Sequence, residues 1–363
     1  MNRRKPILSL FSCIVVILSL SGYLSSCDTE DRYTSNPKEN FDALWSELDK
    51  GYCYFDIKLP KDSTWRDMYD KYVDSLRPKM STDSLFRVMT MLIRELKDGH
   101  VNLITPFNNG RYWNWKDDYP RNLNIYVRDK YLGHDYSIAA GFKYKKIKYN
   151  NHAKDSIALV VYNSFSSPIG EGNINGMLSR LIDCKAIILD IRDNGGGNMN
   201  YADKLASHFI NKKTLVGYIS HKTGPKHDQF SKPYPMYINP VEKGVRWLRP
   251  VVLLTDRGVF SAANDFAMRM KDLPLVTIIG DHTGGGAGLP MSTELPNGWG
   301  VRYSSSRSFD AKMRDVEFGI APHYTVMLNK EDEQKDIDNV IEEAISYINN
   351  KYEELKRTGF WFK

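Results

Sequence analysis

The stretch VVLLTDRGVFSAANDFAM, residues 251–268, decides the fold of this chain. Its apolar beginning, Val251–Leu254, predicts a buried strand, and the polar residues that follow predict a tight turn. Ser261 then opens a run of small and helix-forming residues, which predicts a helix. A serine at such a junction lies at the positive end of the helix dipole, beside free backbone N–H groups, where several hydrolase folds place a nucleophile. A serine that only caps the helix is the alternative that this segment leaves open.

A second stretch, AIILDIRDNGGGN at residues 186–198, has the same strand-then-turn organisation. Ala186–Ile191 predicts another buried strand. Gly195, Gly196 and Gly197 follow, and residues without a Cβ let the backbone adopt positive φ and approach a ligand closely. No Lys-Ser or Lys-Thr pair comes next, so the glycines do not form a nucleotide-binding loop. They either direct N–H groups into a site or form a plain flexible turn.

The third stretch is LKDGHVNL, residues 96–103. Apolar residues recur at helical spacing before it, which predicts an amphipathic helix that begins near Ser81 or Asp83 and ends at Gly99. His100 would then lie at a sharp junction between this helix and a strand. A single histidine is most often structural or solvated, so His100 becomes a candidate only in the company of the other two stretches.

Four motifs occur in a fixed order along the chain: LKDGH (96–100), ILDIRDNGGGN (188–198), FSAANDFA (260–267) and IIGDHTGGGAG (278–288). Together they resemble the C-terminal processing, or tail-specific, serine peptidases and their relatives in the tricorn core and the retinoid-binding proteins. The resemblance covers approximately Phe41 to Ile348. It implies an α/β, crotonase-like peptidase domain with a serine nucleophile, no metal and no cofactor.

The resemblance also divides the family by its general base. Members with a Ser-Lys dyad carry a lysine in the later glycine-rich turn, but the matching position here is Gly286. The tricorn-like branch uses a histidine from the early helix–strand junction, where His100 stands. We therefore expect Ser261 as the nucleophile and His100 as the base. Activity should then fall as the pH drops through about 6–7, where an ordinary imidazole titrates.

Two further roles come from the resemblance. Relatives orient the histidine with a glutamate near a Gly-Ile/Val-x-Pro-Asp stretch, and the local match, VEFGIAPH at residues 316–323, offers Glu317. Glu317 stands two residues before the glycine instead of three, and His323 replaces the aspartate, so a solvated surface carboxylate is the alternative. The resemblance places the oxyanion hole at the N–H groups of Ala262 and Gly196.

Two other clusters have weaker patterns. Asp281-His282 and the pair His221 and His227 match no spacing of zinc ligands, so we expect no metal site. The aromatic loop at residues 107–119 either lines a substrate groove or packs between the helical lead-in and the main domain.

The N-terminus predicts a bacterial lipoprotein signal. NRRK at residues 2–5 is a positively charged n-region, and Ile7–Leu20 is apolar but short for a membrane span. LSSC, which ends at Cys27, resembles a lipoprotein cleavage site. Cys27 is therefore the expected lipidation site, which would anchor the protein in the bacterial cell envelope, at the outer membrane on its periplasmic side or at the cell surface. An ordinary secretory peptide with an incidental Cys27 is the alternative.

The composition excludes other classes of function. The chain carries a formal net charge of +6, and removal of the signal with its three basic residues leaves +3, which is too small and too unpatterned for a nucleic-acid partner. Cys13 leaves with the signal and Cys27 takes the lipid. Only Cys53 and Cys184 then remain, and one pair is no disulfide framework.

The order of the expected elements divides the chain into parts. They are a signal peptide (1–26), a tether (27–40), an N-terminal helical cap domain (41–100), a β-rich connection without a PDZ domain (101–156) and the peptidase domain (157–363). Strands are expected in the connection at Val101–Thr105 and Leu123–Val127. From residue 157 onward strands and helices alternate, which favours an α/β sheet covered by helices.

We therefore expect a membrane-anchored, extracytoplasmic serine endopeptidase that hydrolyses peptide or protein substrates. A non-catalytic binding protein on the same scaffold is the alternative, and the presence of both Ser261 and His100 favours the enzyme. An acyl-CoA enzyme of the related crotonase fold is disfavoured, because an exported protein meets little CoA.

Overall fold

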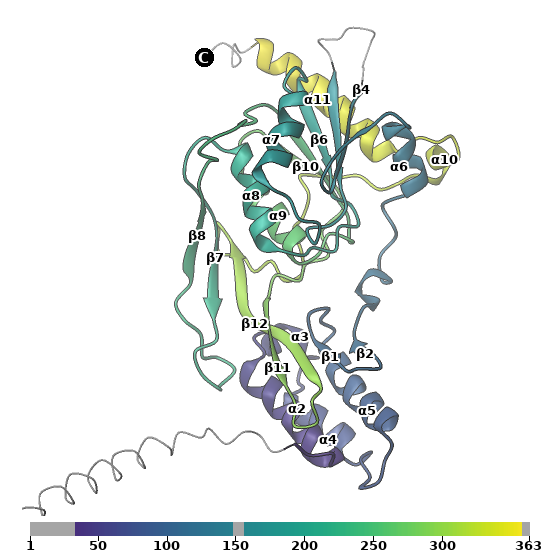
Figure 1. The fold of residues 1–363 in the computed structure, drawn as a ribbon, viewed down its shortest axis with the longest axis vertical. Coiled ribbons are helices and arrows are strands. Elements are labelled where there is room, and N and C mark those ends of the chain that lie inside the picture. Colours follow the sequence, from purple (N-terminus) through teal and green to yellow (C-terminus); the bar gives the residue numbers. More distant parts are fainter. Residues whose placement is uncertain (1–32, 148–155, 358–363) are drawn as a thin grey trace, which may run out of the picture.

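The computed structural model describes residues 33–147 and 156–357. Two sheets organise these residues (Figure 1). The strands are β1 (Asn102–Ile104), β2 (Asn109–Arg111), β3 (Ser137–Ala139), β4 (Phe142–Ile147), β5 (Ile157–Tyr162), β6 (Ala186–Asp190), β7 (Thr214–His221), β8 (Tyr234–Ile238), β9 (Val251–Thr255), β10 (Val276–Gly280), β11 (Leu289–Glu294), β12 (Gly300–Asp310) and β13 (Tyr324–Thr325).

The helices surround these sheets. They are α2 (Pro37–Gly51), α3 (Phe55–Lys58), α4 (Trp65–Val73), α5 (Thr82–Arg94), α6 (Ile125–Leu132), α7 (Glu171–Arg180), α8 (Met199–Ala206), α9 (Ala262–Lys271), α10 (Lys330–Glu333) and α11 (Asn339–Arg357), with short 3-10 turns η1 (Asn114–Lys116) and η3 (Ser207–Phe209).

The larger sheet has the strand order β13-β10-β9-β6-β5-β4-β3. Its central strands β5, β6, β9 and β10 are parallel, and their apolar residues alternate between two hydrophobic cores, one on each face. Helices α7, α8 and α9 cover one face, while α6 and α11 cover the other. Strands buried on both faces explain the continuous apolar runs in the sequence, and the prediction of an α/β fold with an N-terminal helical region is confirmed.

A third core lies in the N-terminal part of the molecule. It joins helices α2 to α5 and strand β1 to the β11–β12 hairpin, through Leu295, Trp299, Val301 and Tyr303. The other end of β12 pairs with β7 in the second sheet, which has the order β2-β1-β12-β7-β8. One strand therefore belongs to both parts of the molecule, and Figure 1 shows it crossing from one to the other.

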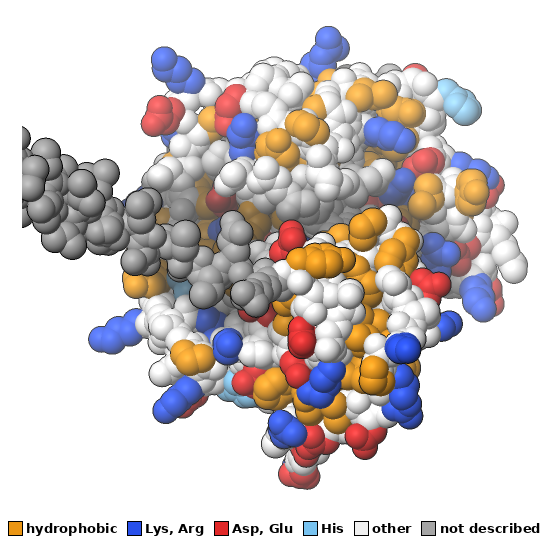
Figure 2. All heavy atoms as spheres, turned by 60° about the horizontal axis from the view of Figure 1, so that its bottom comes forward, with side chains coloured by type: hydrophobic (Ala, Val, Ile, Leu, Met, Phe, Trp, Pro, Cys, Tyr) orange, Lys and Arg blue, Asp and Glu red, His pale blue; other side chains and the backbone are white. Residues whose placement is uncertain are grey.

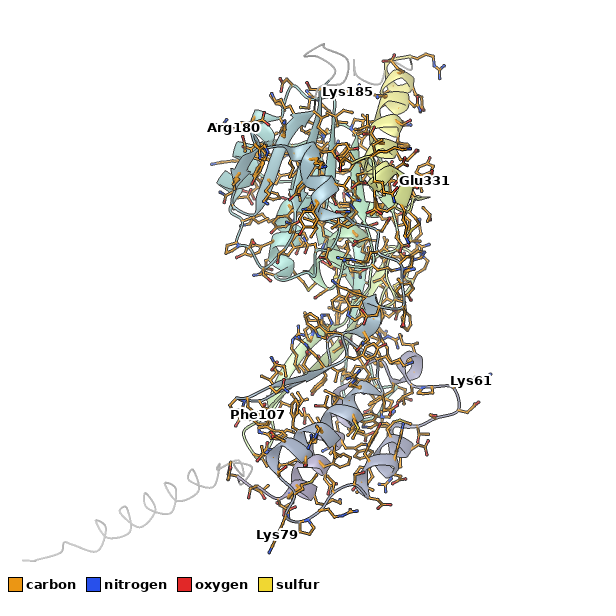
Figure 3. All side chains as sticks on the ribbon, turned by 90° about the vertical axis from the view of Figure 1, so that its right-hand side faces the viewer. Lys61, Lys79, Phe107, Arg180, Lys185 and Glu331 are labelled. Atoms are coloured by element: carbon orange, nitrogen blue, oxygen red, sulfur yellow. The ribbon has the colours of Figure 1, made fainter. Side chains whose placement is uncertain are left out.

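The two parts stack along the long axis of the molecule. Figure 3 shows Lys79 and Phe107 on the N-terminal part, which we call the helical lobe (residues 33–111 with β11 and the first half of β12). Arg180, Lys185 and Glu331 lie on the remainder, the sheet domain. The helical lobe thus contains a hairpin from far along the chain, which the division at residue 100 did not anticipate.

Two local expectations were wrong. The segment expected as a strand at Leu123–Val127 instead opens helix α6, because the side chain of Asn124 accepts hydrogen bonds from the N–H groups of Tyr126 and Val127 and so caps a helix. Helix α5 ends at Arg94 and not at Gly99, and Lys97, with φ of 46°, adopts the left-handed conformation in the turn that follows the helix.

The surface shows no segregation of charge on the face drawn in Figure 2, where Lys and Arg side chains lie among Asp and Glu, with orange hydrophobic patches between them. None of the helices in residues 33–147 and 156–357 combines the length and hydrophobicity needed to cross a membrane. The same residues contain no group of three or more His, Cys, Asp and Glu side chains arranged to hold a metal ion.

Candidate active site

Ser261 lies between β9 and α9 in a backbone conformation that few residues adopt. Its φ is 57° and its ψ is −125°. For a residue other than glycine such a conformation costs about 1–3 kcal/mol and persists only where the surroundings hold it. The side chain makes no capping hydrogen bond to α9. The interpretation of Ser261 as an ordinary helix cap is therefore wrong.

The loops on both sides of Ser261 hold it in place. Its N–H donates to the carbonyl of Gly285 at 2.9 Å, and the N–H of the preceding Phe260 donates to the carbonyl of Asn194 at 3.0 Å. The carboxylate of Asp256 accepts from the N–H groups of Asp193 and Gly258 at 2.8 and 2.9 Å. The glycine-rich loops that contain Gly195–Gly197 and Gly284–Gly286 thus meet around one serine.

His100 is brought to this serine from the helical lobe. Its Nε2 lies 3.0 Å from the Oγ of Ser261. The N–H of His100 donates to Oδ1 of Asp98 at 2.7 Å, and Oδ2 of Asp98 accepts from the hydroxyl of Tyr52 at 2.7 Å. Asp98 therefore fixes the backbone turn that points the imidazole toward Ser261.

The imidazole of His100 is buried, with 3% of the residue exposed. The pKa of His100 is lowered to about 4, mainly by burial and in smaller part by the cations Arg302 and Lys58, while Asp98 and the carbonyl of Gly288 act in the opposite direction. Within the described residues, Nδ1 of His100 makes no hydrogen bond, although the carbonyl of Gly288 lies close enough to raise the pKa of the ring. At neutral pH the ring is neutral, which is the form that can accept a proton.

Gly196 and Ala262 both lie beside Ser261. The N–H of Ala262 has no hydrogen-bond partner among the described residues. A Cβ on Gly196, whose φ is 93°, would lie 2.8 Å from this nitrogen and 2.8 Å from the Cβ of Ser261. The N–H of Gly196 itself donates to Oδ1 of Asn194 at 3.0 Å. In this structure the N–H of Gly196 is therefore not the free donor that we expected, and the absence of a Cβ there permits the close approach of Ser261 and Ala262.

Glu317 is buried near the site but makes no hydrogen bond to His100. Its Oε1 lies 2.7 Å from Nζ of Lys58, and its Oε2 accepts from the N–H groups of Ala287 and Gly288 at 2.8 and 3.3 Å. The alternative of a solvated surface carboxylate is wrong, because the residue is 2% exposed. Direct contact with the imidazole is also absent, since Lys58 and the two backbone N–H groups occupy both carboxylate oxygens.

The pKa of Glu317 reflects these surroundings. Burial raises it to about 7, with a further contribution from Asp98, and Lys58 together with the N–H of Ala287 pulls it back. The carbonyl of Gly288 acts on His100, and the N–H of the same residue binds Glu317. Glu317 thus holds the loop that faces the imidazole.

Two hollows meet at Ser261. One, of about 370 Å³, is lined by His100, the glycines 195–197 and the aromatic loop, and the other, of about 150 Å³, continues past Ala262 toward Leu289. Arg302 lines both. A chain that ran through the two hollows would pass directly over the hydroxyl of Ser261.

The aromatic loop serves both of the purposes that its sequence allowed. Trp115 stacks on Phe260 with ring centroids 4.8 Å apart, and Phe260 in turn packs against the ring of His100 at 4.9 Å. A Cβ on Gly99 would lie 3.0 Å from Phe260 and 3.2 Å from Trp115, so the glycine permits this close packing. Trp113 is 54% exposed and lines the larger hollow.

Several supporting residues were missed in the sequence. Lys58 stands on a four-residue helix and carries no pattern that links it to Glu317. Arg192 is buried and pairs with Asp190 and Asp338 at 2.7 and 2.8 Å, which ties the strand β6 motif to the start of α11. The signal for this second group was present, because charged residues within a buried strand motif need partners.

Comparison with known proteins gives this arrangement a context. Residues 156–326 match the family described as Peptidase family S41. A putative peptidase from Parabacteroides merdae ATCC 43184, known from a crystal structure, is 45% identical to this chain in sequence. The match covers 87% of this chain and 97% of that one, and the two structures superpose with a TM-score of 0.80. The chain belongs to peptidase family S41. Three of the four sequence motifs lie within the matched residues, and LKDGH at residues 96–100 precedes them.

Other proteins are similar to this chain over shorter stretches or in fold alone. The carboxy-terminal processing protease CtpA of Bacillus subtilis (strain 168) is 28% identical over 123 residues, which are 34% of this chain and 24% of that protein. The chloroplastic carboxyl-terminal-processing peptidase 2 of Arabidopsis thaliana is 24% identical over 140 residues, which are 38% and 25% of the two chains. The matches thus span about a quarter of the length of these curated relatives. Mature CPAF shares the fold, with a TM-score of 0.66 at 11% identity over 87% of this chain and 96% of its own.

Proposed function

We propose that this S41 protein is a serine endopeptidase, with Ser261 as nucleophile and His100 as general base. The observation that carries the proposal is the 3.0 Å approach of Nε2 to Oγ, at a serine whose strained backbone is held by hydrogen bonds to two glycine-rich loops. Nucleophile and base within hydrogen-bond reach, with the base neutral at working pH, are what acyl transfer requires. Peptides or proteins are the substrates.

The chemistry follows from the positions of the groups. Oγ of Ser261 attacks the carbonyl carbon of the scissile bond as Nε2 of His100 takes its proton, and the imidazolium then returns the proton to the departing amine. Phe260 packs against the ring of His100 and Trp115 stacks on Phe260, so the imidazole is shielded from bulk water, while Ser261 stays open to the two hollows from which the water that hydrolyses the acyl-enzyme would enter.

Charge that develops on the carbonyl oxygen needs donors in the space beside Ser261. The N–H of Ala262, at the start of α9, is the first donor, and the helix dipole favours negative charge there. The N–H of Gly196 would be the second if it exchanged Asn194 for the oxyanion. Glu317 acts on the base only through the loop at Gly288, as a positioning residue.

A fluorophosphonate probe and variants of the pair test the proposal. The probe should label Ser261 of the mature protein, Ser261→Ala should abolish the label, and the exposed Ser292→Ala should retain it. Ser261→Ala and His100→Ala should each remove nearly all hydrolysis of a protein substrate, with losses of up to about 10⁶-fold, and the double variant should be little worse, because the two act as a unit.

The opposite results would favour the binding-protein alternative. A folded wild-type protein that takes up no probe and hydrolyses no substrate has the scaffold without the activity. Hydrolysis that persists in Ser261→Ala would place the nucleophile elsewhere.

We further propose that a lipid on Cys27 anchors the protein in the bacterial cell envelope. Cys27 lies outside the described residues, and the proposal rests on the signal-like sequence that precedes it. The described chain enters the helical lobe, where the N–H of Thr34 donates to the carbonyl of Pro296 at the tip of the β11–β12 hairpin. A tether from Cys27 would therefore join the described chain at the helical lobe.

A further inference from the structure

Arg302 lies where the two hollows meet at Ser261. It lies on β12, directly opposite Asn102 of β1 and Ser292 of β11. Residues directly opposite in an antiparallel pair share one face of the sheet, and Asn102 lines the larger hollow as well. Its neighbours Val301 and Tyr303 are buried in the core of the helical lobe. The strand is therefore fixed on both sides of Arg302, whose side chain lines both of the hollows that meet at Ser261.

Among the charged side chains that line the two hollows, Arg302 alone has no partner in the described residues. Lys116 pairs with Asp193 at 2.7 Å, and Asp265 pairs with Arg269 at 2.8 Å. No hydrogen bond or ion pair joins the guanidinium of Arg302 to the described chain. The carboxylate of Asp98 acts on it electrostatically, but both of its oxygens already accept hydrogen bonds.

Another arginine of the same strand shows the contrast. Arg307 pairs with Asp56 at 2.8 Å and with Asp315 at 2.9 Å, and so links β12 to its surroundings. Arg302 makes no such link, and burial lowers its pKa because the guanidinium has lost part of its hydration without gaining a carboxylate. A half-buried, unpaired guanidinium beside a nucleophile is arranged to receive an anion.

We propose that Arg302 binds a carboxylate of the substrate next to the scissile bond and so gives the enzyme a preference for acidic peptides. This proposal rests on the peptidase activity proposed above. The planar fork of arginine matches a carboxylate in two parallel hydrogen bonds. A peptide offers this group in two places, as an Asp or Glu side chain and as its C-terminal carboxylate.

Matched peptides test the preference and separate the two sources. Mass spectrometry first identifies the bond that is cleaved. Each position within two residues of this bond then carries either Glu or Gln. Every peptide is made both with a free and with an amidated C-terminus. The wild-type protein should cleave one carboxylate-bearing member with a kcat/KM about tenfold or more above its amide counterpart, the factor that a charge-assisted hydrogen bond supplies. A side-chain effect identifies an acidic residue, and an effect of amidation alone identifies the C-terminus.

Variants assign the preference to Arg302. Arg302→Gln should abolish the preference, and Arg302→Lys should retain part of it, because the positive charge remains without the planar fork. Lys116→Gln removes a paired cation in the same hollow and should leave the ratio of kcat/KM between acid and amide peptides unchanged. Equal cleavage of acid and amide peptides by the wild-type protein, or an unchanged ratio in Arg302→Gln, would overturn the proposal.

Labelling and binding keep this test separate from the test of the activity. If the fluorophosphonate probe labels Ser261 equally in wild type and Arg302→Gln while no acidic preference exists, the peptidase stands and the role of Arg302 falls. If the wild type hydrolyses nothing, fluorescence anisotropy in the Ser261→Ala background still decides, because the Glu peptide should bind about tenfold more tightly than the Gln peptide only when Arg302 is present. Equal binding would reject the proposal there too.

Discussion

At the scale of single residues, the imidazole of His100 is the group whose environment departs most from what its sequence suggested. An ordinary histidine would lose its basic form below about pH 6–7. Because burial lowers the pKa of His100 to about 4, the ring stays neutral over the whole range above that value. The activity is therefore expected to fall at a lower pH than the range of about 6–7 that the sequence suggested.

We predict that kcat/KM falls only as the pH drops through about 4, because protonation of His100 then removes the base. Stopped assays with brief exposure at each pH, and circular dichroism to show that the fold persists, measure this limb. Arg302→Gln should move the limb to higher pH, since Arg302 is one of the cations that lower this pKa. A limb centred at pH 6–7 would mean that the ring is solvated during catalysis.

Gly196 and Gly195 offer a matched pair of substitutions. A Cβ on Gly196 would lie 2.5 Å from the carbonyl oxygen of Phe260 and would fill the space beside the N–H of Ala262, whereas a Cβ on Gly195 would meet nothing within 4 Å. Gly196→Ala should therefore reduce kcat by about 10²-fold or more, as loss of one oxyanion donor does. Gly195→Ala should stay within a few-fold in the same assay. Similar losses in both variants would contradict a specific role for the space at Gly196.

At the scale of elements, helix α3 supports the site through one ion pair. Lys58 and Glu317 are 8% and 1% exposed at their side chains, so neither charge is satisfied by water. We predict that Lys58→Met destabilises the protein by about 3–5 kcal/mol at pH 8, because the buried carboxylate of Glu317 loses the cation with which it pairs. The loss should be smaller at pH 5, where a Glu317 whose pKa is raised takes up a proton instead.

Urea unfolding of four proteins measures this coupling: the wild type, Lys58→Met, Glu317→Gln and the double variant. The double variant should recover much of the stability lost in Lys58→Met, since no unpaired charge remains. If the losses of the two single variants simply add, the pair is not a coupled buried unit.

The elements also show how far the sequence could be interpreted. Apolar runs such as Val251–Leu254 correspond to central strands, because parallel strands buried on both faces require them. Strand β12 carries no such signal, since its buried positions include Ser304, Ser306 and Ser308, which break the apolar alternation. The contact between Lys58 and Glu317 could not be predicted from the sequence, because only the folded chain brings these distant positions together.

At the scale of the whole molecule, the site is formed where two parts meet. His100 comes from the helical lobe and Ser261 from the sheet domain, and both were identified from motifs that are far apart in the chain. The motif order could predict the two residues. It could not predict that β12 would connect their surroundings, nor that Trp115 would be inserted beside Phe260.

The proposed anchor makes its own prediction at this scale. Diacylation at Cys27 should place the mature protein in the membrane fraction, from which detergent and not salt releases it, because the attachment is hydrophobic. Cys27→Ser should give uncleaved or soluble protein with the same probe labelling at Ser261. Mass spectrometry of the mature N-terminus measures the lipid, and an unlipidated N-terminus at any other residue would rule the anchor out.

The shared strand β12 has a consequence for dividing the protein. A break in the chain between η1 and α6 would leave His100 on one fragment and Ser261 on the other. The antiparallel register of Asn102–Ile104 with Gly300–Arg302, and the hydrophobic side chains of the β11–β12 hairpin, would then act as a template for reassembly. The protein would therefore serve as a split reporter, because hydrolytic activity would show that two separately produced fragments have reassembled.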